Sequence, residues 1–114
     1  MKQDKDTEQK INKLQLLEQN MQTFILQRQS LQAQLSEITN ASKELRDTKG
    51  NVYKIVGNIM VLANKANLEK DLESKRELIE LRIKNLEKQE NKIREEATEL
   101  QKDILKRMKN DKEN

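Results

Sequence analysis

The chain has 114 residues, of which 33% are hydrophobic, 38% are charged and 2% are aromatic, and this is too little apolar material for an ordinary compact domain. It contains no cysteine, histidine or proline, so it lacks the residues for disulfides, thiolate chemistry and the commonest general base. Its 23 basic and 20 acidic residues alternate along the chain and leave no concentrated positive patch for nucleic acid. Composition therefore predicts a mainly helical protein with a narrow apolar stripe, and not an enzyme.

The first predicted helix runs from about residue 6 to residue 48. Its apolar residues recur at steps of three and four, as in a coiled coil, and they are Leu14, Leu17, Met21, Phe24, Leu31, Leu35, Ile38 and Leu45. Arg28 and Ser42 fill the two remaining places of this seam. Asp6 followed by Gln9 predicts a capping box at the start of the helix, and Gly50 predicts a left-handed stop after its end.

The period changes in the next segment, residues 51–62. β-Branched and aromatic residues dominate here, and Gly57-Asn58 lies in the middle. This pattern predicts two short strands around a tight turn, with the glycine supplying a positive φ.

The second predicted helix runs from about residue 65 to residue 109, with Asn64 as its N-cap. Its apolar stripe has the same spacing and consists of Leu72, Ile79, Ile83, Leu86, Ile93, Ala97, Leu100 and Ile104; Arg76, Glu90 and Arg107 interrupt it. Two stripes of equal length joined by a short connection predict a long antiparallel two-helix coiled coil. The alternative, two parallel coiled coils shared with a second chain, is disfavoured by the short connection.

An isolated two-stranded hairpin is marginally stable in water, and its strand edges are open to pairing. We therefore expect hairpins from several subunits to complete a shared sheet or barrel, with the alternative that the hairpin folds onto its own helices. The residues predicted to mediate assembly are Val52, Tyr53, Ile55, Val56, Gly57, Ile59, Met60 and Val61.

In an antiparallel hairpin the beginning of the first helix and the end of the second meet. The apolar residues predicted there as contacts for nonpolar partners are Ile11, Leu14, Leu16, Leu17, Leu100, Ile104, Leu105 and Met108. Leu16 and Leu105 fall outside the seam and should face solvent, whereas the seam residues among them have the alternative role of closing the coiled coil. Arg28 and Glu90 either pair across the seam and fix its register or extend separately to water.

The segment from Val52 to Val61 resembles the hairpin motif of β-class prefoldin subunits, in which a tyrosine, a basic residue and a valine–glycine pair precede a second apolar strand. The stretches 31–35 and 81–90 are also similar to that family. A single hairpin matches the β class, since α-class subunits carry two.

The resemblance implies an ATP-independent co-chaperone without cofactor or metal. Family members form a heterohexamer of α-class and β-class subunits, whose hairpins build a β-barrel platform and whose coiled-coil tips hold unfolded proteins for a group II chaperonin. The alternative function is a passive coiled-coil scaffold that binds one defined helical partner. The polar N-terminus and the absence of any apolar run of roughly 20 residues predict a cytoplasmic protein without contact to membranes.

Overall fold

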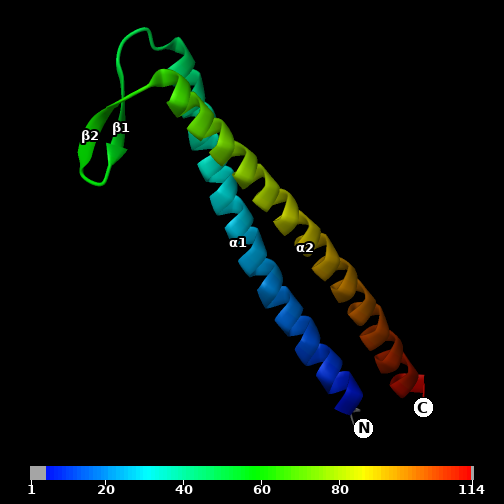
Figure 1. The fold of residues 1–114 in the computed structure, drawn as a ribbon. Helices are drawn as coiled ribbons and strands as arrows, with labels where there is room; N and C mark the ends of the chain where they lie inside the picture. The colour runs from blue at the N-terminus through cyan, green and yellow to red at the C-terminus, as the bar shows by residue number, and fades with distance from the viewer. Residues whose placement is uncertain (1–4, 114) are drawn as a thin grey trace. The chain divides into compact units, whose positions relative to one another are not determined.

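The structure is a computed structural model and describes residues 5–113. The elements follow in the order α1 (Lys5–Asp47), β1 (Val52–Val56), β2 (Ile59–Ala63) and α2 (Lys65–Glu113). The predicted fold class is confirmed, because α1 and α2 are long antiparallel helices joined by a β-hairpin (Figure 1). The chain divides into two units. We call residues 29–84, which include the hairpin, the hairpin unit, and we call residues 1–28 together with 85–114 the terminal unit.

Within the hairpin unit, the end of α1 and the beginning of α2 pack through the predicted stripe. The most deeply buried apolar side chains are Leu45, Ile79 and Ile83, each 7–8% exposed. No large side chain among the described residues falls below 2% exposure. A narrow seam between two helices, and not a three-dimensional core, therefore supplies the hydrophobic stabilisation.

The connection between the helices begins where α1 ends at Asp47. Gly50 does not adopt the predicted left-handed conformation, since Gly57 is the only described glycine with a positive φ. The last carbonyls of α1 are instead satisfied by side chains: the Thr48 hydroxyl donates to the Glu44 carbonyl at 2.7 Å. The Lys65 ammonium donates to the carbonyls of Arg46 at 3.3 Å and Thr48 at 2.9 Å. The Lys65 ammonium thus caps the C-terminus of α1 in place of the glycine, and its positive charge is favourable at that end of a helix.

The start of α2 has the predicted cap. The Asn67 backbone N–H donates to the Asn64 side-chain oxygen at 3.1 Å, and the Leu68 N–H donates to the Asn64 carbonyl at 3.0 Å. These bonds satisfy donors that the first turn of a helix leaves without intrahelical partners, and so Asn64 is confirmed as the N-cap.

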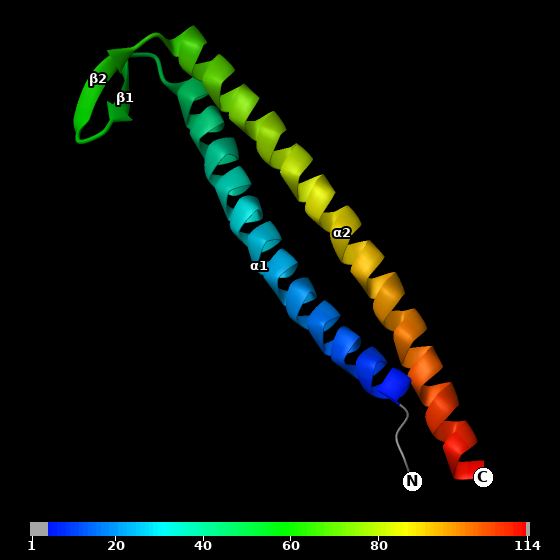
Figure 2. The same cartoon turned by 60° about the horizontal axis from the view of Figure 1, so that its bottom comes forward.

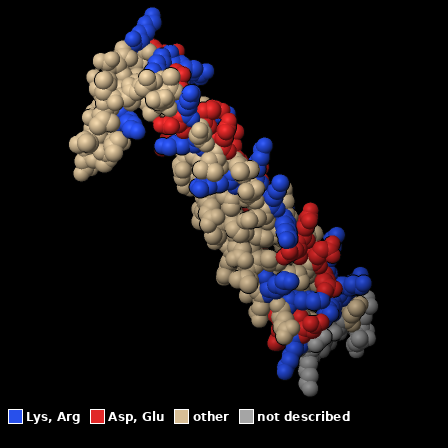
Figure 3. Space-filling view, viewed as in Figure 1, with Lys and Arg blue, Asp and Glu red and all other residues tan. Residues whose placement is uncertain are grey.

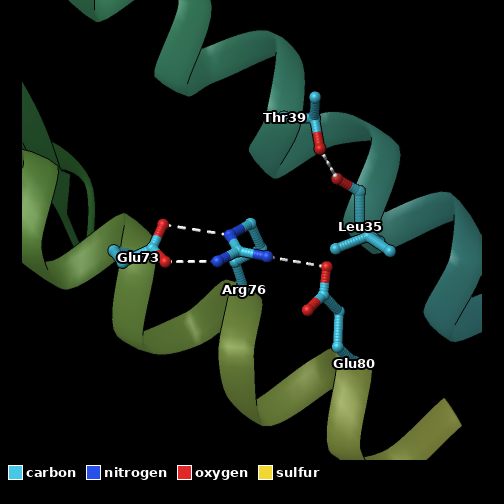
Figure 4. A network of polar contacts seen from close by, with 5 residues as sticks. All are labelled: Leu35, Thr39, Glu73, Arg76 and Glu80. Carbon is cyan, nitrogen blue, oxygen red and sulfur yellow. Dashed lines mark hydrogen bonds and ion pairs between the residues drawn. The ribbon is translucent and has the colours of Figure 1, made fainter. Parts of the chain in front are cut away.

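Arg76 interrupts the seam of α2 and bonds within its own helix (Figure 4). Its guanidinium donates to Glu73, with Nε at 2.9 Å from Oε2, and to Glu80, with Nη1 at 2.7 Å from Oε1. The bond with Arg76 lowers the pKa of Glu73, and the same bond raises the pKa of Arg76. Across from it, the Thr39 hydroxyl is engaged with the Leu35 carbonyl at 2.9 Å. The helices therefore meet here at a polar groove, lined by Thr39, Ser42, Arg46, Glu69, Glu73 and Arg76.

In the terminal unit, the beginning of α1 and the end of α2 lie side by side (Figure 2). Arg28 and Glu90 pair across this part of the seam: the Arg28 Nε donates to both carboxylate oxygens of Glu90, at 3.0 and 2.9 Å. The Glu90 side chain is 7% exposed and that of Arg28 is 25% exposed. Of the two alternatives for these residues, the structure shows the pair.

Candidate functional sites: the hairpin and the helix ends

The hairpin is a two-stranded antiparallel sheet with the predicted two-residue turn. Val52 lies opposite Ala63, and Val56 lies opposite Ile59. Gly57 has a φ of 62°, and no other described residue has a positive φ, so the turn has the backbone pattern of type II′. A side chain at this φ would be strained even where space is available, and therefore the turn depends on the glycine.

One face of the hairpin is wholly apolar and exposed. Because side chains alternate along a strand, this face consists of Tyr53 and Ile55 from β1 with their partners Leu62 and Met60 from β2. Their exposure ranges from 51% at Tyr53 to 74% at Ile55. In the space-filling view the hairpin is almost free of charge, in contrast to the helices (Figure 3).

The other face is partly covered on the side away from the turn. Val52, Val61 and Ala63 are half-buried there, whereas Val56 and Ile59 beside the turn are exposed. The hairpin therefore leaves six large apolar side chains uncovered within the single chain. Its own helices do not cover these six side chains.

The residues predicted at the helix ends fall into three groups. Leu17 and Ile104 are buried in the seam, each 8% exposed, and Ile11, Leu14 and Leu100 are half-buried. Leu16, Leu105 and Met108 are exposed, and the first two lie outside the seam as the spacing predicted. The terminal unit thus brings the two predicted sets together, but presents only three of their eight side chains openly.

Two ion pairs at the helix ends were not predicted from the sequence. The Arg107 Nη1 lies 2.8 Å from the Asp6 Oδ2, and the Lys10 ammonium contacts the carboxylate of Asp103. The bond from Lys10 holds the pKa of Asp103 below its usual value. Asp6 lies inside α1 and pairs with α2, so the predicted capping box is wrong. The sequence does contain a signal for these bonds, because each helix carries an acidic residue followed four residues later by a basic one.

Among the described residues, no group of three or more His, Cys, Asp or Glu side chains could hold a metal ion. Two grooves near the end of α2 are lined largely by charged and amide side chains. Within the described chain, neither helix has the length of apolar sequence that crossing a membrane requires.

Together these features define a class of protein: a two-helix coiled coil whose helices are joined by an exposed apolar β-hairpin. Comparison with known proteins identifies the family. The sequence profile described as "Prefoldin subunit" matches residues 8–111, so the chain belongs to the prefoldin family, among its beta subunits.

Individual relatives agree with this assignment. The chain is 42% identical over 93 residues to prefoldin subunit beta of Archaeoglobus fulgidus, covering 80% of each protein. It is 36% identical over 94 residues to the Sulfolobus acidocaldarius subunit, covering 81% of this chain and 75% of that protein. The crystal structure of the prefoldin beta subunit from Thermococcus strain KS-1 matches with a TM-score of 0.82 and 31% identity, covering 87% of this chain and 89% of the other.

Family membership settles the general role of the chain. Prefoldin subunits are non-enzymatic chaperones, and a beta subunit belongs to a prefoldin complex. The structure adds which apolar side chains of the hairpin and of the helix ends are exposed in this chain.

Proposed function

We propose that this chain is an ATP-independent co-chaperone subunit that holds unfolded proteins at its helix ends and delivers them to a group II chaperonin. In this proposal it works in the cytoplasm as part of a heterohexamer with α-class and further β-class subunits. Their hairpins would complete a shared β-barrel.

The observation that carries the proposal is the uncovered hairpin. Tyr53, Ile55, Met60 and Leu62 form a continuous apolar face on an element that is marginally stable alone. Burying that face against other hairpins would remove it from water and would pair its open strand edges. A passive coiled-coil scaffold has no need of such an element.

Client holding is supported by the partial covering of the helix ends. Leu16, Leu105 and Met108 are exposed on the terminal unit, and seam residues lie close by in sequence. Each such contact is weak and has no fixed geometry, which suits clients of unrelated sequence. Repetition of these ends in one complex raises the apparent affinity without any strong individual site.

The assembly half of the proposal is tested by a charged hairpin. Val56→Lys with Ile59→Lys should abolish the heterohexamer formed with an α-class subunit, as measured by native mass spectrometry. The matched control is Leu78→Lys with Leu81→Lys, which charges two equally exposed leucines on α2 and should leave assembly intact. A charged hairpin that still enters a complex of unchanged mass would contradict the role given to the hairpin.

The client half is tested by aggregation of a denatured protein without ATP. The assembled complex should suppress aggregation, and removal of residues 1–17 and 100–114 should weaken suppression while leaving the hexamer whole. Transfer is then followed by adding a group II chaperonin and measuring how much labelled client moves to it. A complex that leaves the client to aggregate at the control rate would favour the scaffold.

A further inference from the structure

At the end of the terminal unit, two ion pairs between α1 and α2 accompany the buried seam residues. The first buried seam residue of α1 in the described chain is Thr7, 5% exposed, which offers little apolar surface compared with leucine. On either side of it in sequence, Asp6 and Lys10 bond to Arg107 and Asp103 of α2. Ile104, which is buried, lies between these two α2 residues in sequence.

We propose that these two ion pairs, Asp6–Arg107 and Lys10–Asp103, form an autoinhibitory clasp that keeps the apolar seam closed until a client competes for it. The proposal rests on the proposed client-holding function. It assigns the pairs a role in controlling how much seam surface the helix ends present.

The order of charges makes the clasp specific for one register. Along each helix the acidic residue precedes the basic one: Asp6 before Lys10 in α1, and Asp103 before Arg107 in α2. Because the helices are antiparallel, Asp6 lies opposite Arg107 and Lys10 lies opposite Asp103. Sliding one helix by a turn would bring Asp6 toward Asp103, which repel each other. The same slide would bring Lys10 toward Glu99, so the observed register keeps two attractions and the shifted register keeps only one.

The clasp is also weak enough to open. The side chains of Asp6 and Asp103 are 55% and 45% exposed, and exposed ion pairs are screened by salt and contribute little each. Further along the seam the situation is reversed, because Glu90 is buried and bonded to Arg28. Separating that pair would strand a buried charge, so opening should stop before it.

Opening of the seam between the clasp and the Arg28–Glu90 pair would increase the apolar surface that the helix ends offer to a client. In the closed state Leu17 and Ile104 are covered, while Leu16, Leu105 and Met108 are exposed. In the open state the covered residues would join the exposed ones in a larger apolar surface. The free energy of closing then reduces client affinity, because only the open fraction can bind fully.

The test neutralises one of the two pairs by replacing its members with uncharged amide side chains. Lys10→Gln with Asp103→Asn, in the complex assembled with an α-class subunit, should speed amide hydrogen exchange of residues 5–17 and 100–110 roughly threefold at low salt. Client affinity should rise by a similar factor. Lys13→Gln with Glu99→Gln is the matched control, since it removes one base from α1 and one acid from α2 at exposed positions, and it should change neither measurement.

A charge exchange separates pairing from mere loss of charge. Lys10→Asp alone and Asp103→Lys alone should each open the ends, and the double exchange should restore much of the protection. Unchanged exchange in the neutral double variant, or a charge exchange as open as its single variants, would overturn the clasp. Faster exchange without any gain in client affinity would overturn its autoinhibitory role. If the unmodified complex binds no client at all, the proposed function fails, and the exchange data still decide whether the clasp exists.

Discussion

The bond between Arg28 and Glu90 predicts that replacing Arg28 lowers the free energy of unfolding more than replacing Glu90 does. The Glu90 carboxylate is almost fully enclosed, whereas the Arg28 side chain keeps a quarter of its surface in solvent. Arg28→Leu would leave the enclosed carboxylate without its two hydrogen bonds, and losing one partner of a buried pair costs about 3 kcal/mol or more. Glu90→Leu leaves an arginine that can extend to water along its aliphatic stem, so we expect a cost of about 1 kcal/mol.

The double replacement isolates the pairing. With Arg28→Leu and Glu90→Leu together, two apolar side chains occupy the seam, and no charge is stranded. Replacing a buried ion pair in this way is often neutral or stabilising by about 1–4 kcal/mol. The double variant should therefore be at least as stable as the unmodified chain, although one polar constraint on register is lost.

The measurement is urea unfolding followed by helical circular dichroism, at one protein concentration because assembly contributes to stability. Register is checked by introducing one cysteine on α1 and one on α2 and measuring which pairs form a disulfide. The chain has no native cysteine that would interfere. Equal losses from the two single replacements, or a double variant as unstable as Arg28→Leu, would refute the reasoning from burial.

The remaining predictions concern single caps, the turn and one carboxyl group. Asn64→Ala should lower the free energy of unfolding by about 1 kcal/mol and Asn64→Asp by less, since aspartate still accepts the N–H bond at the start of α2; urea titration measures both. Lys65→Met should cost about 1 kcal/mol, because the last carbonyls of α1 lose their donor, and faster amide exchange at the end of α1 should accompany it. Gly57→Ala should cost about 1–2 kcal/mol through strain at positive φ and should lower the yield of complex in native mass spectra. The bond from Lys10 lowers the pKa of Asp103, so the charge of Asp103 stabilises the folded chain above the ordinary aspartate pKa of about 3.9. The difference between unmodified chain and Asp103→Asn in thermal melts should therefore be present at neutral pH and disappear as pH falls through the lowered pKa.

Periodicity was a sufficient guide to the long elements. A seam repeated over many turns is a redundant signal, so α1 and α2 were predicted within a few residues at each end. The hairpin was equally clear because the period changed from helical to alternating and Gly57-Asn58 permits only a few turns. Pairing of Arg28 with Glu90 could be anticipated because both interrupt the seam at similar distances from the connection.

The helix ends were harder to predict, because several residues can satisfy the same backbone group. Gly50 looked like a stop, yet Lys65 reaches back across the connection to the end of α1. Asp6 had the spacing of a cap, yet it bonds to Arg107, a residue about a hundred positions away. Local patterns cannot decide between a near and a distant partner when both are chemically suitable.

The two apolar surfaces of this chain differ in a way that fits two kinds of occupant. On the hairpin, four neighbouring side chains form one face held in fixed register, and all four are more than half exposed. A fixed surface of that kind is buried best by a partner of constant shape, such as another hairpin. At the helix ends, exposed leucines lie next to buried apolar residues, and in the proposed clasp the ion pairs would control how much of the buried surface is presented. A surface that is partly covered by its own chain can remain in water while no client is bound and still offer more area when one arrives. In the proposed function, permanent assembly and transient holding require different degrees of burial, and the hairpin and the helix ends of this chain differ in that way.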